Sequence, residues 1–154
     1  MKILVVSDTH GHGDRLKKAV EKTLPFEMLI HCGDGLKDLA SINLPVETVV
    51  TTVKGNTDVY YTGDSEEFII ENIMGRRVAI THGHMFHVKA GTSYLFAEAA
   101  RMGVDAVLFG HTHVRQLSPG FPLLFNPGSL SDNSYGVILA EDEGEWIFEH
   151  RSLV

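Results

Sequence analysis

Short apolar runs that end in polar residues recur along the chain and predict alternating strands and helices. Five of these runs are typical of buried strands, because each is short, apolar and bounded by turn residues. They cover Lys2–Ser7, Phe26–His31, Val46–Val53, Arg76–Thr81 and Ala106–Phe109. Apolar residues at helical spacing predict helices over residues 14–24, 36–42 and 89–102.

The remaining runs predict further strands. Residues 67–72 pair with residues 76–81 around Gly75, and three more strands follow at 123–126, 136–141 and 145–150 in a pattern that resembles a β-meander. Strand–helix alternation followed by strands favours a layered α/β domain with two sheets, both mixed. The chain shows no repeat and no linker, so we expect one domain over residues 1–154.

Composition narrows the possible partners. The chain is 44% hydrophobic and 21% charged, which is typical of a globular domain. Its formal net charge of −7 argues against long nucleic acid as a partner, because such binding needs a basic surface. A phosphate ligand stays possible, since bound divalent cations invert the local field.

Two further features concern the cellular compartment. The single cysteine, Cys32, permits no disulfide within the chain, which suits a reducing cytosol. No apolar run approaches the ~20 residues of a membrane-spanning helix, so we expect no membrane partner. Together these features predict a cytoplasmic protein.

Metal-binding residue types follow five of the predicted strands. In open α/β sheets, ligands bind just outside the carboxyl ends of the strands, so these side chains are expected to converge at one edge. They are Asp8, His10, Asp34, Asn56, His82, His111 and His113.

The seven side chains supply two carboxylates, one amide and four imidazoles. This mixed oxygen and nitrogen set suits manganese, iron, zinc, nickel or cobalt far better than calcium or magnesium alone. Seven ligands exceed the needs of one tetrahedral ion but suit two ions that share a carboxylate. Two metals about 3.5–4 Å apart form a clamp for displacement at phosphorus.

Five short motifs in order carry a resemblance to a known family. They are Asp8-Thr9-His10, Gly33-Asp34, Gly55-Asn56, His82-Gly83-His84 and Gly110-His111-Thr112-His113, with Asn126-Pro127-Gly128-Ser129 downstream. This set resembles the signature of the calcineurin-like metallophosphoesterases, and the short length is most similar to their minimal prokaryotic phosphodiesterases. A eukaryotic retromer scaffold subunit of the same fold is also similar.

The resemblance implies a four-layer α/β/β/α sandwich and two divalent ions, with manganese first and nickel, iron or zinc as the other candidates. It places Asp8, His10, Asp34 and His113 at the first metal, with Asp34 bridging. It places Asn56, His82 and His111 at the second metal. A water molecule bridging the two metals would then act as the nucleophile.

One position departs from the family pattern. Many members have a histidine after the Gly-Asn pair, and it is thought to protonate the leaving group; here the residue is Thr57. General acid catalysis is typically worth about 10²–10⁴-fold, so its loss favours diesters and acidic leaving groups. His84 or His12 would be the substitute, and we therefore assign His84, with Asn56, to the catalytic residues.

Simpler readings exist for single motifs. Asp8 suits a helix N-cap, Asn56 an ordinary turn, and His82 a hydrogen-bonded core position. Each is reasonable alone, but all five motifs together favour the metal site. His31 and Cys32 are expected to be structural.

The sequence therefore predicts a metal-dependent phosphodiesterase that acts on a small phosphodiester or nucleotide. The alternatives are a non-catalytic scaffold on the same fold, and a regulatory domain that binds metal or nucleotide without hydrolysis. An exposed edge strand in the C-terminal region would allow a homo-oligomer.

Overall fold

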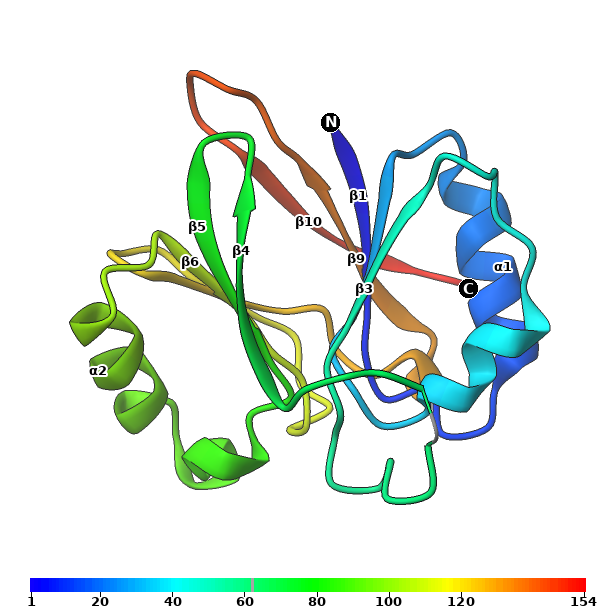
Figure 1. Cartoon of the computed structure of the whole chain (residues 1–154), viewed down its shortest axis with the longest axis horizontal. Coiled ribbons are helices and arrows are strands. Elements are labelled where there is room, and N and C mark those ends of the chain that lie inside the picture. Colours follow the sequence, from blue (N-terminus) through cyan, green and yellow to red (C-terminus); the bar gives the residue numbers. More distant parts are fainter. Residues whose placement is uncertain (62) are drawn as a thin grey trace.

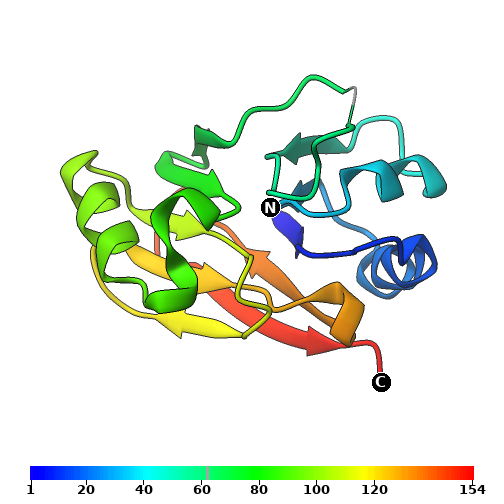
Figure 2. The ribbon, with the colours of Figure 1, turned by 90° about the horizontal axis from the view of Figure 1, so that it is seen from below.

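Two β-sheets pack face to face between helical layers (Figure 1). The structure is a computed structural model, and it describes residues 1–61 and 63–154. Figures 1 and 2 show α1 on one outer side and α2 on the other, with the strands between them. This is the predicted four-layer α/β/β/α sandwich with two mixed sheets of five strands each.

The first sheet has the order β10-β9-β1-β2-β3. Its central strand β1 pairs in parallel with β2, which pairs in parallel with β3; β9 and β10 add antiparallel strands on the other side. The bounds are Lys2–Val6 for β1, Met28–His31 for β2, Val49–Thr52 for β3, Ser134–Leu139 for β9 and Ile147–Ser152 for β10.

The second sheet has the order β4-β5-β6-β8-β7. Strands β5, β6 and β8 are parallel, while β4 and β7 are antiparallel edges. Met74 and Gly75 both have positive φ in the β4–β5 turn, as a tight two-residue hairpin turn requires. The bounds are Phe68–Ile73 for β4, Arg76–Thr81 for β5, Ala106–Leu108 for β6, Gln116–Ser118 for β7 and Leu123–Asn126 for β8.

The alternation of side chains along the strands builds three apolar layers. In β1, Ile3 and Val5 point into the core between the two sheets, whereas Leu4 and Val6 pack on the α1 side. Helix α1 (Gly13–Thr23) buries Leu16 against the first sheet.

A third cluster lies under α2 (Ser93–Arg101). There Leu95 and Ala99 pack against Val107 and Leu124 of the second sheet. Because both faces of each sheet are covered, the central strands are continuously apolar, as the sequence predicted.

The structure corrects two of the sequence-based predictions. The helix expected over residues 89–102 is divided: Val88–Ala90 forms a 3₁₀ turn, and α2 begins only at Ser93. Gly91 interrupts it with a φ of 126°, a conformation that a helix does not contain.

The C-terminal strands do not form one meander. Strand β8 pairs with β7 in the second sheet, whereas β9 and β10 cross to the first sheet. The short edge strand β7 was not predicted. Local patterning does not specify which sheet a strand joins, because that choice depends on contacts with β1 and β6.

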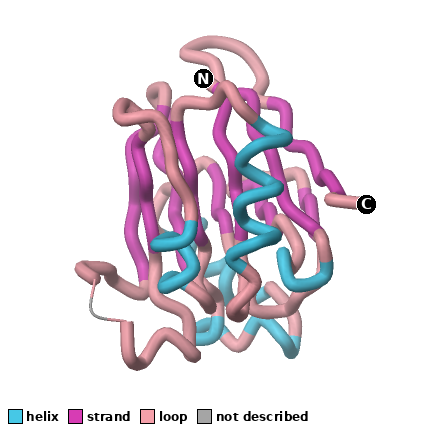
Figure 3. The backbone as a smooth tube through the Cα atoms, turned by 90° about the vertical axis from the view of Figure 1, so that its right-hand side faces the viewer, coloured by secondary structure: helices cyan, strands magenta, loops and turns pink. Residues whose placement is uncertain are grey.

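The loops that follow the parallel strands gather at one end of the sandwich, together with the short helical turns (Figure 3). Among these turns are Leu36–Ser41, His84–Phe86 and Leu130–Asp132. No helix in the described part of the chain is both long and apolar enough to cross a membrane.

Candidate metal centre

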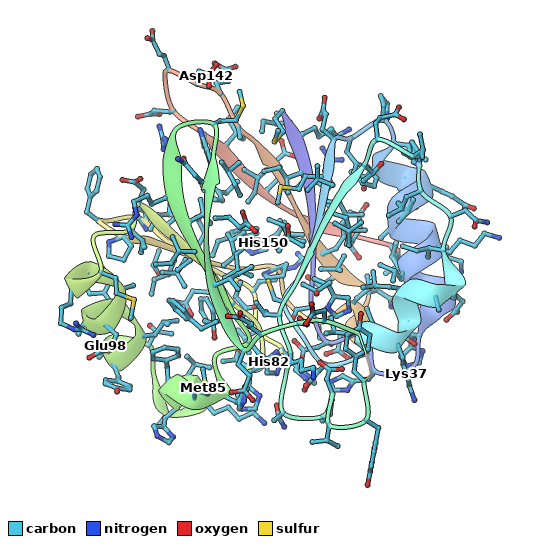
Figure 4. The ribbon with its side chains drawn as sticks, viewed as in Figure 1. Lys37, His82, Met85, Glu98, Asp142 and His150 are labelled. Carbon is cyan, nitrogen blue, oxygen red and sulfur yellow. The ribbon has the colours of Figure 1, made fainter. Side chains whose placement is uncertain are left out.

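Six of the seven predicted ligands form two triplets at this end of the molecule. In each triplet the donor atoms lie within 4.8 Å of one another. Asp8 and His10, after β1, meet His113, after β6. Asp34, after β2, meets His82 and His111, after β5 and β6. Each triplet therefore combines residues from both sheets, and Figure 4 shows His82 at the lower end of the strands.

The two triplets share their carboxylates. His82 Nε2 lies 3.2 Å from Asp34 Oδ2 and 3.8 Å from Asp8 Oδ1. His10 Nε2 lies 3.8 Å from Asp34 Oδ2, across the boundary between the triplets. Asp34 and Asp8 therefore each face an imidazole of the other triplet.

Asp8 is completely buried, and its two oxygens differ. Oδ2 accepts hydrogen bonds from Ser7 Oγ at 2.6 Å and from the His111 backbone N–H at 3.2 Å. Oδ1 has no hydrogen-bond partner among the described residues, although His113 Nε2 is 3.2 Å away. A buried carboxylate oxygen without a donor is unfavourable, and a cation held by Asp8 and the imidazoles would satisfy it. The residues present therefore fit divalent metal ions.

Both carboxylates are ionised in this setting. Burial raises the pKa of Asp8, but the neighbouring His10, His82 and Ser7 outweigh that effect and leave the pKa below its usual value. Burial also raises the pKa of Asp34, yet His82 and the Thr57 N–H hold it far below the usual range. Two ionised carboxylates side by side provide the negative charge that divalent cations need.

His82 is oriented as a metal ligand would be. Its Nδ1–H donates to the carbonyl oxygen of Cys32 at 2.7 Å, which leaves Nε2 facing the carboxylate of Asp34. Such a bond from the second ring nitrogen is the usual way in which proteins orient ligating histidines. The backbone of Cys32 thus supports the site, while burial raises the pKa of its thiol and keeps the sulfur inert.

The pKa values of the imidazoles shift in different directions, depending on the charges around each ring. Burial lowers the pKa of His82, but Asp34 and Asp8 outweigh it, so the pKa is raised overall. The nearby carboxylate of Asp8, whose Oδ1 lies 3.4 Å from His10 Nε2, raises the pKa of His10. Burial and then His82 lower the pKa of His111 to about 4.

The backbone at the site is strained. Among the described residues, eight non-glycine residues have a positive φ, and five of these are predicted ligands. They are Asp8, His10, Asp34, His111 and His113. Such conformations cost on the order of 1–3 kcal/mol each and cluster at functional sites.

The loop after β3 supports Asp34 from the other side. The Thr57 N–H donates to Asp34 Oδ1 at 2.9 Å, and the neighbouring Asn56 is exposed beside it. Gly55 lies so close to Asp34 that a Cβ there would collide with the carboxylate. The residues on either side of Asn56 therefore lie against Asp34.

Asp58 is a functional residue that the sequence reasoning did not single out. Its buried carboxylate accepts four backbone N–H bonds of 2.7–3.1 Å, from Asp34, Gly35, Leu36 and Gly55. It therefore fixes the loop that carries Asp34 to the loop that carries Asn56. Its place two residues after Asn56 was the available signal.

The two candidate acids lie in different places. The ring of His84 is 5.6 Å from that of His82 and 6.2 Å from that of His111, so it borders the second triplet. Burial, followed by His82, lowers the pKa of His84. His12 is the N-cap residue of α1.

The Asn126–Ser129 turn supports the centre. Asn126 Nδ2 donates to the Gly110 carbonyl at 3.1 Å, and Ser129 Oγ donates to the Asp8 carbonyl at 3.1 Å. The turn thereby holds the loops after β6 and β1, which carry four predicted ligands.

Sequence comparison identifies the family. Residues 1–141 match the Calcineurin-like phosphoesterase superfamily domain. The chain belongs to this superfamily. It is 28% identical over 152 residues to the protein named Probable metallophosphoesterase YsnB of Bacillus subtilis, covering 93% of this chain and 86% of that one. It is 30% identical over 154 residues to Phosphodiesterase MJ0936 of Methanocaldococcus jannaschii, covering 89% of each.

Solved structures show the same fold. A predicted phosphoesterase from Streptococcus pneumoniae superposes with a TM-score of 0.78 at 23% identity, over 99% of this chain and 89% of that one. Vps29 from Entamoeba histolytica, in complex with Zn²⁺, superposes with a TM-score of 0.73 at 19% identity over the full length of both chains.

Proposed function

We propose that this metallophosphoesterase is a phosphodiesterase that uses two divalent metal ions to hydrolyse a small phosphodiester or nucleotide. The observation that carries the proposal is the pair of adjoining triplets around Asp8 Oδ1, a buried oxygen without a hydrogen-bond partner. The family and the name of the archaeal relative support the reaction class.

The proposed ligand sets join the two triplets with the assignments that the family resemblance implies for Asp34 and Asn56. Asp8, His10 and His113 would hold the first ion, Asn56, His82 and His111 the second, and Asp34 both. When bound, the two ions would supply an activated water molecule and neutralise charge on the phosphate. We propose manganese as the metal, with nickel, iron or zinc as substitutes, and a cytoplasmic location.

Thr57 supports a preference for diesters. In the sequence, Thr57 follows the Gly-Asn pair, where many members of the family have the histidine that acts as the acid. An aliphatic hydroxyl does not protonate a leaving group at neutral pH. His84 borders the second triplet, and its lowered pKa favours the neutral ring. We therefore assign His84 a role in binding the substrate phosphate by hydrogen bonding.

Hydrolysis by metal-stripped protein tests the proposal. Bis(p-nitrophenyl) phosphate and p-nitrophenyl phosphate are assayed before and after addition of manganese. Activity should appear only with metal and should favour the diester. The absence of hydrolysis of either ester with manganese, nickel, iron or zinc would favour the alternative, a non-catalytic scaffold or binding protein on the same fold.

A further inference from the structure

A pocket of about 320 Å³ opens beside the candidate metal centre. Three loops form it, each following a parallel strand of the first sheet. Its principal lining residues are His10 after β1, Lys37 after β2, and Thr57, Asp58, Tyr60 and Tyr61 after β3. Because His10 also belongs to the first triplet, the pocket begins where a bound phosphate would lie.

Two charged side chains of the described residues, Lys37 and Asp58, line the pocket, and only that of Lys37 is free to contact a ligand. Both carboxylate oxygens of Asp58 are engaged by four backbone N–H groups. The exposed ammonium of Lys37 offers a hydrogen-bond donor and a positive charge at the rim of the pocket. In Figure 4, Lys37 and His82 lie at the same end of the molecule, with the loop after β3 between them.

Two consecutive tyrosines form the aromatic part of the pocket. Tight turns place them there: the Asp58 N–H donates to the Gly55 carbonyl, and the Tyr61 N–H donates to the Asp58 carbonyl. Tyr60 is 93% exposed, so it contributes nothing to the core. An aromatic ring beside a phosphate site offers a face on which a flat base can stack.

We propose that this pocket binds the nucleoside group of the substrate, with the base stacked on Tyr60 or Tyr61 and the phosphate at the metal centre. The proposal rests on the proposed phosphodiesterase function and names its substrate class, an ester of a single nucleotide. The volume lies at the small end of the range for ligand pockets, which suits one nucleoside and not an oligonucleotide.

Calorimetric titration of manganese-loaded protein with AMP, phenyl phosphate and methyl phosphate tests the assignment. One stacked base is worth roughly a tenfold or larger gain in affinity. AMP should therefore bind about tenfold more tightly than methyl phosphate, and more tightly than phenyl phosphate. The double variant Tyr60→Ala/Tyr61→Ala should lose this advantage and bind methyl phosphate as the unaltered protein does.

Tyr94→Ala is the matched control, because Tyr94 is a half-exposed tyrosine on α2, outside the pocket. It should change none of the three affinities. Equal affinity for AMP and phenyl phosphate, or an unchanged AMP affinity in the double variant, would overturn the nucleoside assignment.

The diester assay separates the two proposals. Hydrolysis of bis(p-nitrophenyl) phosphate without tighter binding of AMP would overturn the pocket and leave the hydrolase function standing. Tyrosine-dependent binding of AMP without hydrolysis of any diester would overturn the hydrolase function and leave the nucleotide site.

Discussion

At the scale of single residues, substitution of Asp34 is expected to reduce hydrolytic activity the most. Its Oδ2 faces imidazoles of both triplets, while its Oδ1 accepts the Thr57 N–H. Asp34→Asn keeps a neutral acceptor for that bond and removes the charge. Loss of a residue that only hydrogen-bonds to a metal ligand typically weakens metal affinity about 10–100-fold. Loss of a carboxylate that itself binds the metals should therefore lower activity by more than about 100-fold.

Manganese-dependent diester hydrolysis and circular dichroism would measure that effect and check that the fold survives. Asp142→Asn is the control, because Asp142 lies in an exposed turn at the opposite end of the molecule (Figure 4). Full activity of Asp34→Asn would contradict a shared carboxylate.

A second prediction at this scale concerns His31 and the dependence of stability on pH. It is fully buried; its Nδ1 accepts the Gly33 N–H, and its Nε2–H donates to Thr9 Oγ1. Burial lowers its pKa from 6.5 to about 4. Between these values the unfolded chain binds the proton and the folded protein does not, so stability falls as pH falls.

A shift of this size corresponds to about 3 kcal/mol. Urea unfolding of metal-free protein at pH 7 and pH 4 would measure the loss. His31→Gln lacks the titrating ring, so its unfolding free energy should fall by about 3 kcal/mol less over this range. The other titrating groups are present in both proteins and cancel in the difference. Parallel pH profiles would refute the assignment.

At the scale of elements, Asp58 joins the loop after β2 to the loop after β3. An amide at this position offers one acceptor atom in place of two and turns donors toward backbone N–H groups. Asp58→Asn should therefore lower the unfolding free energy by about 2–3 kcal/mol. It should also weaken manganese binding, because the loop that carries Asp34 loses its anchor.

Urea unfolding and manganese titration would measure both effects. Asp64→Asn supplies the control, since Asp64 lies outside the metal centre and lines a separate surface pocket beside β3 and β4. An Asp58→Asn protein with unchanged metal affinity would show that the anchor does not serve the site.

At the scale of elements, most of the strands could be predicted from the sequence, but not all of their pairings. The strands that precede Asp8, Asp34 and His82 were predicted because each apolar run ends in a polar residue and a glycine. Their convergence followed from the parallel order, which brings strand ends to one edge of each sheet. The pairing of β9 with β1 could not be predicted, because it depends on contacts between residues far apart in the chain.

The aromatic pocket was missed for a similar reason. Tyr60 and Tyr61 have no periodic partners in the sequence, and only the turns after Gly55 bring them beside Lys37. The partners of Asp58 could not be predicted from residue types either, because all four donors are backbone groups. The position of Asp58 two residues after Asn56 was its one signal in the sequence.

At the scale of the whole molecule, the metal centre joins the two sheets. Asp8, His10 and Asp34 follow strands of the first sheet, whereas the other members of both triplets follow strands of the second. Metal bound at both triplets would cross-link the sandwich at one end. Manganese at about 100 times its Kd should stabilise the protein by roughly 2.7 kcal/mol, or about 5–10 °C in Tm.

This stabilisation should depend on pH, and the direction follows from the histidines. The nearby carboxylate of Asp8 raises the pKa of His10 above 6.5. Burial lowers the pKa of His82, but Asp34 and Asp8 outweigh burial and raise the pKa overall. A metal must displace any proton on these rings, so apparent affinity falls as pH drops through the region above 6.5. Thermal unfolding at fixed manganese should show a large Tm gain at pH 8 and a much smaller one at pH 6.

Asp142→Asn should behave like the unaltered protein, and Asp34→Asn should show little gain at either pH. A gain in the unaltered protein that is equal at both pH values would mean that the bound ion does not compete with protons on His10 and His82, and that these rings do not hold it.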